Sequence, residues 1–370
     1  MIEHKNHKHR NPFIVTPMGN FLQAIGDTHL GRVFKNDVRL ERRGDYEAQQ
    51  IEELRKLLDT EKPELNKGNF AIVQAGDWFD KPVVNLAVIM KSAEMLNAYA
   101  HKQASSTNFV ELVVISGNHD DAKNVSDVTA WDVLARTMAE SIHNMHGSVR
   151  FIKDYYVKRF DNGEEILFIG WNITTNACKA LLAAIEDGYK SITTVVCHLD
   201  KISYGNDDNV IPYEFFAQQG IKMVISGHEH KPYYFYDQGM EVIGTGSLLP
   251  YSHAEDDGEE IYVTLHSINE FEEYAQEHNI HGKHIRLILD EADQERVGEL
   301  KDVNTLSLKI VKKGVDVAVL DMDAVDEVHQ VNIQAYDAKS VWENTVAETA
   351  LCPVIGKLIW QEIEAKGTEE

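Results

Sequence analysis

The sequence predicts an α/β fold in which two sheets are layered with helices. Two observations support this: strand-length apolar runs alternate with helical segments in the first half, and strands then follow one another directly over residues 149–169. The character of the sequence changes after about residue 265. We therefore expect an N-terminal extension over residues 1–18, a core domain over 19–267 and a smaller α+β region over 268–370.

The predicted helices are recognised by apolar side chains that recur every three or four residues. They are expected over residues 45–58, 84–99, 126–142, 177–185, 212–219, 269–278 and, in interrupted form, 341–366. Short apolar runs bounded by turn residues predict the strands. These are expected over residues 21–25, 70–74, 112–115, 149–152, 155–160, 165–169, 193–197, 223–226, 234–237, 241–244, 284–289, 306–311 and 328–335.

The composition limits the class of protein. Hydrophobic residues make up 43% of the 370, which is enough for a sizeable core, and no apolar run approaches the roughly 20 residues of a membrane helix. Three widely spaced cysteines and a polar N-terminus without an apolar core region lead us to expect a cytoplasmic protein. The net charge of −24 argues against non-specific nucleic-acid binding but is compatible with a nuclease, because bound metal ions invert the local field.

Five predicted strands end in a small residue followed by Asp, Asn or His. The candidate metal ligands at these strand ends are Asp27, His29, Asp77, Asn118, His198, His228 and His230. Seven ligands exceed the four of a tetrahedral zinc, and they suit two ions about 3.5–4 Å apart that share one carboxylate. Mixed imidazole and carboxylate ligands are compatible with Mn, Zn or Fe, and such ions make hydroxide available near neutral pH.

Two further residues of the same turn are candidates for catalysis. His119 follows the candidate ligand Asn118 directly and cannot easily bind the same ion. We expect it to stabilise the transition state or to protonate the leaving oxygen. Asp120 is expected to orient the His119 ring through a ring N–H.

These stretches resemble the calcineurin-like metallophosphoesterases. The motifs are Gly26-Asp27-Thr28-His29-Leu30-Gly31, Gly76-Asp77-Trp78-Phe79-Asp80, Gly117-Asn118-His119-Asp120, His198 and Gly227-His228-Glu229-His230. The Asp-x-His-Leu-Gly form of the first motif, and the Gly-Ser-containing segment 243–252, are most similar to the DNA-repair nuclease branch. That branch includes bacterial SbcD-like nucleases and the recombination endonuclease subunit of tailed phages.

The resemblance implies a four-layer α/β sandwich with a smaller capping domain, and it distributes the ligands over two ions. Asp27, His29 and His230 would bind one ion, Asn118, His198 and His228 the other, and Asp77 would bridge them. His119 would be the catalytic histidine. We expect two divalent ions, with Mn²⁺ preferred.

The function that the resemblance implies is metal-dependent hydrolysis of DNA phosphodiester bonds, as the exonuclease or endonuclease subunit of a recombination or repair complex. Expected partners are DNA, an SMC-like (SbcC-like) ATPase subunit and a second copy of the chain. Residues 291–370 hold 17 Asp and Glu against 8 Lys and Arg, which favours a protein partner over DNA for the tail. The alternative is a phosphodiesterase or phosphatase that acts on cyclic nucleotides or phosphoproteins. A scaffold without activity is disfavoured because every ligand is present.

Overall fold

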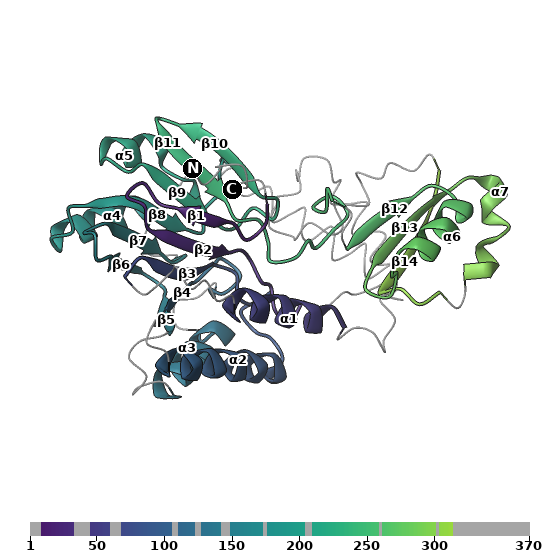
Figure 1. Cartoon of the computed structure of the whole chain (residues 1–370), viewed down its shortest axis with the longest axis horizontal. Coiled ribbons are helices and arrows are strands. Elements are labelled where there is room, and N and C mark those ends of the chain that lie inside the picture. Colours follow the sequence, from purple (N-terminus) through teal and green to yellow (C-terminus); the bar gives the residue numbers. More distant parts are fainter. Residues whose placement is uncertain are drawn as a thin grey trace, which may run out of the picture. The chain divides into compact units, whose positions relative to one another are not determined.

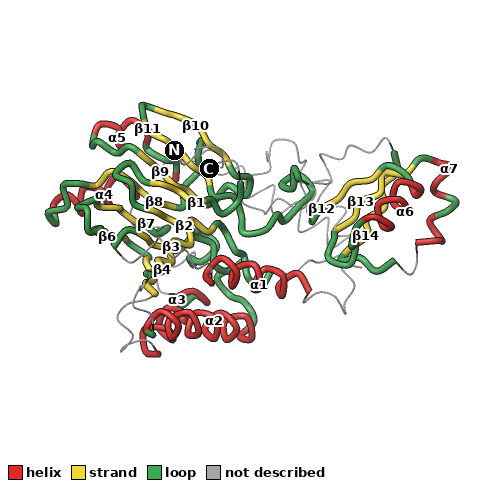
Figure 2. Tube along the Cα trace, in the orientation of Figure 1, coloured by secondary structure: helices red, strands yellow, loops and turns green. Residues whose placement is uncertain are grey.

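Two mainly parallel sheets contain most of the described strands of the computed structural model (Figures 1 and 2). The structure describes residues 9–32, 45–59, 68–105, 110–122, 127–141, 149–172, 176–203, 209–258, 261–300 and 303–313. The strand predicted over residues 328–335 and the helices predicted over 341–366 lie outside this range. No helix among the described residues is long and apolar enough to cross a membrane.

The first sheet has the strand order β1-β2-β3-β4-β5. Its strands are β1 (Phe13–Val15), β2 (Phe21–Ile25), β3 (Phe70–Ala75), β4 (Glu111–Ile115) and β5 (Val149–Ile152). All neighbours are parallel except β1, which runs antiparallel to β2. β1 lies within the range expected as an N-terminal extension, so the described end of that range is part of the sheet.

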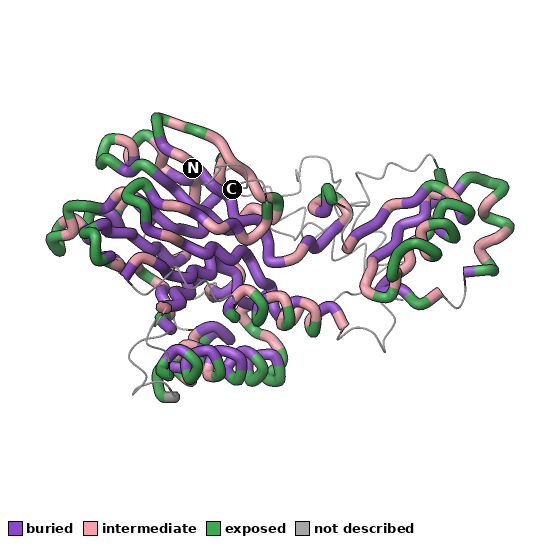
Figure 3. The backbone as a smooth tube through the Cα atoms, in the orientation of Figure 1, coloured by how far each residue is buried: buried purple, intermediate pink, exposed green. Residues whose placement is uncertain are grey.

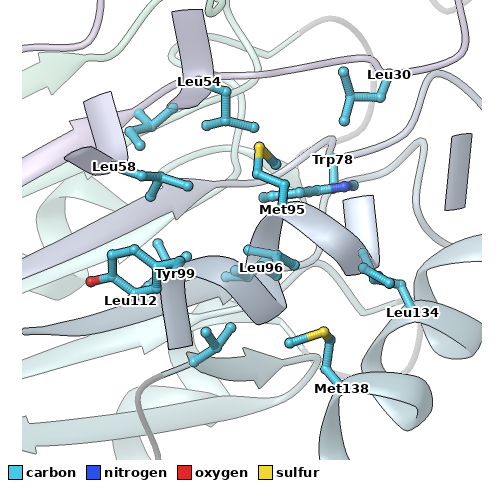
Figure 4. Close-up of a cluster of buried hydrophobic side chains, with 14 of the residues drawn as sticks. Leu30, Leu54, Leu58, Trp78, Met95, Leu96, Tyr99, Leu112, Leu134 and Met138 are labelled. Atoms are coloured by element: carbon cyan, nitrogen blue, oxygen red, sulfur yellow. The ribbon is translucent and has the colours of Figure 1, made fainter. Parts of the chain in front are cut away.

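Helices α1 (Asp45–Asp59), α2 (Leu86–Ala104) and α3 (Ala130–Ser141) cover one face of the first sheet. Leu54, Leu96 and Leu134, one from each helix, belong to the same buried cluster as Leu112 of β4 (Figure 4). The strands alternate between two faces, as the period of two in a strand requires. In β3, Ile72 packs with the helices, whereas the neighbouring Val73 packs on the opposite face.

The second sheet has the order β10-β11-β9-β8-β7-β6. Its strands are β6 (Tyr155–Arg159), β7 (Glu165–Ile169), β8 (Ile192–Cys197), β9 (Met223–Ser226), β10 (Tyr233–Asp237) and β11 (Met240–Gly244). Helices α4 (Ala177–Glu186) and α5 (Tyr213–Gln218) pack on its outer face, where Val195 and Cys197 of β8 join them. Val196 of the same strand points the other way, into a cluster shared with Val73.

That shared cluster holds the two sheets together. It contains side chains of β2, β3 and β4 from the first sheet and of β7, β8, β9 and β11 from the second. Most strand residues are consequently buried on both faces (Figure 3). The layers run helix, sheet, sheet, helix, which confirms the predicted two-sheet α/β fold.

A third, smaller sheet follows in the chain. Strands β12 (Tyr262–Leu265), β13 (His284–Leu289) and β14 (Ser307–Lys312) are parallel, with α6 (Ile268–Glu277), α7 (Glu291–Gln294) and a 3-10 helix (Val297–Leu300). This region has its own apolar cluster, in which Phe271 of α6 packs with Ile285 of β13. Its parallel strands alternate with helices, which is an α/β arrangement and not the α+β one expected for the C-terminal region. The division into domains stays a prediction.

Two helices begin two or more residues later than the sequence predicts, and local capping explains both. α2 begins after Asn85, whose side chain accepts the N–H of Ala87 at 2.9 Å, and it runs on to Ala104 rather than ending near residue 99. α3 begins after Thr129. The Thr129 hydroxyl accepts the N–H of Asp132 at 3.2 Å, and the Asp132 carboxylate accepts the N–H of Thr129 at 3.0 Å. This reciprocal pair fixes the first turn.

Candidate metal centre

All seven candidate ligands lie just beyond the carboxyl ends of neighbouring strands. Asp27 and His29 follow β2, Asp77 follows β3, Asn118 follows β4, His198 follows β8, and His228 and His230 follow β9. Because parallel strands end at the same edge of a sheet, this topology gathers the side chains. The first four come from one sheet and the last three from the other.

The first group of ligand atoms comprises Asp27, His29 and His230, with Asp77 beside them. Nε2 of His29 lies 3.0 Å from Nε2 of His230 and 3.6 Å from Oδ2 of Asp77. Nε2 of His230 lies 3.8 Å from Oδ2 of Asp27. These four side chains therefore surround one point.

The second group comprises Asn118, His198 and His228. Oδ1 of Asn118 lies 2.9 Å from Nε2 of His198 and 3.1 Å from Nδ1 of His228, and the two ring nitrogens are 3.3 Å apart. Oδ2 of Asp77 lies 3.2 Å from Nε2 of His198. The same Asp77 oxygen thus borders both groups.

This donor set fits two divalent cations. Two ligand atoms each about 2.1 Å from an ion, at angles of about 90–110°, lie roughly 3.0–3.4 Å apart. The separations found here, from 2.9 to 3.8 Å, are close to that range. Oδ2 of Asp27 is buried and accepts no hydrogen bond within the described residues. A buried carboxylate oxygen without a donor is costly unless a cation satisfies it. The residues that would hold the ions are therefore the seven predicted from the sequence, whose assignment as ligands stays a prediction.

Without a cation, buried charges in the centre compensate one another. Burial raises the pKa of Asp27. Burial opposes the ionisation of Asp77 too, yet His198 and His119 hold the Asp77 pKa well below its usual value. Burial would lower the pKa of His198, but Asp77 and Asp27 outweigh it and raise that pKa to about 10. A metal ion would take the place of such protons.

Three of the four candidate ligand histidines, His198, His228 and His230, have a partner on the ring nitrogen that faces away from the centre. Nδ1 of His198 lies 2.8 Å from the carbonyl oxygen of Ala75, and Nε2 of His228 lies 2.6 Å from Oδ1 of Asp200. Such outer partners fix the tautomer and ring orientation of metal ligands.

In the first group, Nδ1 of His230 lies 3.2 Å from Oε1 of Glu255. Nδ1 of His29 lies 3.6 Å from Oδ1 of Asp80, which is beyond hydrogen-bond distance. Sequence reasoning assigned no role to Asp80, Asp200 or Glu255. Asp200 follows the candidate ligand His198 by two residues, and a carboxylate at this spacing could have indicated a residue near the metal centre. Glu255 lies 25 residues after His230, and no sequence pattern links the two.

The backbone is strained at three of the candidate ligands. His29, Asp77 and His228 have φ values of 41°, 52° and 75°, in the left-handed region that side chains seldom adopt. A Cβ on Gly117 would lie only 2.0 Å from Oδ1 of Asp77. Glycine is required there because the turn approaches the carboxylate closely. Strain and crowding at these positions favour a functional role.

His119 also lies at the centre. Its ring meets the ring of His29 edge-on at 4.7 Å, and its backbone N–H donates to Oδ1 of Asp77 at 2.9 Å. His29, Asp77 and His119 form a third group whose ligand atoms are close enough to hold an ion. Nδ1 of His119 lies 2.6 Å from the backbone carbonyl oxygen of Asp80.

The expected role of Asp120 needs correction. Its buried carboxylate accepts the backbone N–H groups of Trp78, Phe79 and Gly117 at 3.0, 2.9 and 2.9 Å. The carboxylate folds back onto the turn because these buried N–H groups need an acceptor. The carbonyl of Asp80, rather than Asp120, holds the ring of His119, so Asp120 shapes the loop that carries Asp77.

Aromatic residues border the centre in ways that the sequence only partly indicates. Trp78 (Figure 4) and Phe79 are fully buried in the apolar cluster between the first sheet and its helices. The indole of Trp78 donates to the hydroxyl of Ser92 at 3.2 Å. Trp171, which sequence reasoning missed, is half-buried and stacks on His228 with ring centroids 6.4 Å apart.

Comparison with solved structures finds several distant resemblances. The phosphopantetheinyl hydrolase of Mycobacterium tuberculosis is 12% identical over 61% of this chain and 89% of its own, with a TM-score of 0.33. A novel archaeal phosphodiesterase is 14% identical over 61% and 83%, with a TM-score of 0.27. A Staphylococcus aureus protein described as a 5'-nucleotidase is 13% identical over 61%, with a TM-score of 0.35. The match spans only 48% of that longer chain.

A comparison with curated proteins found no match. The comparison with protein families gives a clear result. Residues 24–232, more than half of the chain, match the model of the calcineurin-like phosphoesterases. This range contains all seven candidate ligands and His119. With these residues gathered at one edge of the two sheets, the protein belongs to the calcineurin-like phosphoesterase family, whose members hydrolyse phosphoesters with divalent metal ions.

Proposed function

We propose that this protein is a metal-dependent DNA nuclease, the nuclease subunit of a recombination or repair complex. One observation supports assigning DNA, rather than another phosphoester, as the substrate. Segment 243–252, which resembles the segment that closes the nuclease domain of the SbcD-like branch, packs directly behind the metal centre. The N–H of Leu248 donates to the carbonyl of Asp27 at 2.8 Å, and the N–H of Ser247 donates to the carbonyl of His230 at 3.0 Å.

Tyr251 extends this support. Its hydroxyl donates to the carbonyl oxygens of Asp27 and Thr28 at 3.2 and 2.6 Å, and its ring meets those of His29 and His230 edge-on or tilted. Segment 243–252 thus supports the loop that carries Asp27 and His29, and it also contacts His230. The part of the chain that resembles the nuclease branch is built into the site.

The residues divide the chemistry between them. Bound ions would polarise the phosphate and lower the pKa of the attacking water. Asp27, His29, His230, Asn118, His198 and His228 would hold them, with Asp77 between. The Nδ1 of His119 must carry a proton, because its partner, a carbonyl oxygen, can only accept. Nε2 of His119 is then the atom that faces the phosphate, and it can protonate the leaving oxygen when the ring carries a second proton.

The proposal extends to partners. DNA is the substrate, an SMC-like ATPase is the expected protein partner, and a second copy of the chain is expected from the same resemblance. The acidic composition of residues 291–370 supports contact with a protein rather than with DNA by that region.

The experiment compares three substrates with the purified full chain. End-labelled double-stranded DNA, a cyclic nucleotide and a phosphopeptide are each incubated with Mn²⁺, with and without a chelator. We expect chelator-sensitive cleavage of DNA at a rate well above that of the other two. Faster hydrolysis of the cyclic nucleotide or the phosphopeptide would replace the nuclease with that activity.

A further inference from the structure

Arg10 reaches the back of the metal centre from the start of the chain. Its Nη1 donates to the carbonyl oxygen of His230 at 2.6 Å and to the hydroxyl of Ser247 at 2.6 Å. Its Nη2 donates to the carbonyl oxygen of Glu255 at 2.5 Å. One guanidinium therefore joins three segments that are more than 200 residues away in sequence.

Two of these three acceptors, the carbonyl oxygens of His230 and Glu255, belong to the candidate ligand His230 and to the residue that contacts its ring. Arg10 holds the backbone of His230 and also the backbone of Glu255, while Oε1 of Glu255 lies 3.2 Å from Nδ1 of His230. The other oxygen of Glu255 accepts the N–H of Tyr251 at 2.8 Å. Arg10 thus fixes both the chain position of the ligand and the carboxylate that orients its ring.

Asn11 extends the contact to the ligand on the first sheet. It has a left-handed backbone with φ of 51°, and its Oδ1 accepts the N–H of Gly26 at 3.0 Å, directly before Asp27. Its Nδ2 donates to the carbonyl of Leu248 at 3.1 Å. Residues 10 and 11 together tie the end of β2 to the segment behind His230.

We propose that Arg10 is a positioning residue for the ion that Asp27, His29 and His230 would hold. The acceptors lie in different directions and match a planar guanidinium, which presents several N–H groups in a fixed fork. A lysine offers a single flexible ammonium and cannot hold the same set. The inference concerns the metal centre alone, so metal binding tests it whichever phosphoester the protein hydrolyses.

The same contacts predict a selective effect. Arg10 touches no residue of the group Asn118, His198 and His228 in the described contacts. Loss of Arg10 should therefore weaken the binding of the ion at Asp27, His29 and His230 and leave the binding of the other ion unchanged. A residue that merely fastens β1 to the sheet would lower the stability of the fold and affect both ions alike.

The experiment measures metal affinity in two backgrounds. Arg10→Gln and Arg10→Lys are made in His228→Asn, which leaves the first group intact, and in His29→Asn, which leaves the second intact. Metal-free full-length proteins are titrated with Mn²⁺ by calorimetry, and metal per chain is counted by elemental analysis. We expect Arg10→Gln to weaken Mn²⁺ binding about 10- to 100-fold in the first background only, as for other outer partners of metal ligands. Arg10→Lys should lie between.

Arg159→Gln is the matched control, because Arg159 binds Glu165 on β6 and β7 and contacts no candidate ligand. It should leave both affinities unchanged. Thermal unfolding of each metal-free variant separates positioning from general destabilisation. If Arg10→Gln does not fold, Arg10→Lys carries the same comparison. Unchanged Mn²⁺ affinity in the His228→Asn background, or equal weakening in both backgrounds, would overturn the proposal.

Discussion

Oδ2 of Asp77 lies 3.2 Å from Nε2 of His198, a residue of the opposite sheet. The same oxygen lies 3.6 Å from Nε2 of His29, so one atom borders both groups of ligand atoms. A carboxylate in this position is suited to bridge two ions. The arrangement makes this residue the most informative single position to change.

We expect Asp77→Ala to abolish hydrolysis and to reduce bound metal at both positions, because each group loses the oxygen that they share. Metal per chain is measured by elemental analysis after dialysis against a limiting concentration of Mn²⁺. Asp161→Ala, in an exposed turn, is the control and should keep both ions and full activity. Two ions per chain in the Asp77 variant would show that the residue is not a bridge.

We expect His119→Gln to separate binding from chemistry. The ring is held by the Asp80 carbonyl and is a candidate acid, so metal content and DNA affinity should stay near normal while the single-turnover rate falls about 100-fold or more. His228→Asn should instead lose metal. Loss of an ion in the His119 variant would assign it as a ligand, in keeping with its place beside His29 and Asp77. Retention of both ions and the full rate would make it a residue of the turn only.

We expect activity to require a divalent metal and to prefer Mn²⁺ over Mg²⁺. Four of the seven candidate ligands are histidines, whereas Mg²⁺ favours sites made of oxygen atoms. Protein stripped with a chelator is reconstituted with each metal at equal concentration, and initial rates are compared. Equal rates with Mg²⁺ from which traces of Mn²⁺ have been removed would contradict this preference.

We expect His284 to make the small third sheet sensitive to acid. Burial lowers the pKa of His284 to about 3, and nearby His253 adds to the effect. Since the folded state holds the neutral form, the stabilisation is present above the ordinary pKa of 6.5 and is lost as the pH falls below it. Between pH 7 and pH 5 the loss is on the order of 2 kcal/mol.

The measurement is urea unfolding of metal-free protein at pH 7 and pH 5. His284→Gln cannot take up the proton and offers an amide that can hydrogen-bond Ser307, now 2.7 Å from Nδ1. Its unfolding free energy should therefore change less between the two pH values than that of the unmodified chain. An identical pH dependence in both proteins would show that His284 does not titrate across the transition.

Sequence reasoning succeeded where local pattern decides the structure. Apolar runs ending in glycine and a polar residue located the strand ends at Asp27, Asp77 and Asn118, because buried parallel strands have this pattern. The two-sheet class followed from the order of strands and helices. β1 was not predicted, since Phe13–Val15 is too short for a periodic signal and forms a strand by pairing with β2.

The partners behind the ligands could not be predicted in the same way. Glu255 and Arg10 meet His230 only because the folded chain brings distant segments together. Asp120 was given the wrong partner for a related reason. Adjacency in sequence suggested that Asp120 hydrogen-bonds the His119 ring. In the folded loop, its carboxylate instead accepts the buried backbone N–H groups of Trp78 and Phe79, which need an acceptor.

Because the candidate ligands are distributed over two sheets, tight metal binding should require both parts of the domain to be assembled. Residues up to about 170 supply Asp27, His29, Asp77 and Asn118, and the later part of the family domain supplies His198, His228 and His230. Neither half alone offers a complete set of donors for either ion. If the gene were divided between β6 and β7, the two polypeptides should gain tight Mn²⁺ binding only on association, and the metal would then favour their reunion by mass action.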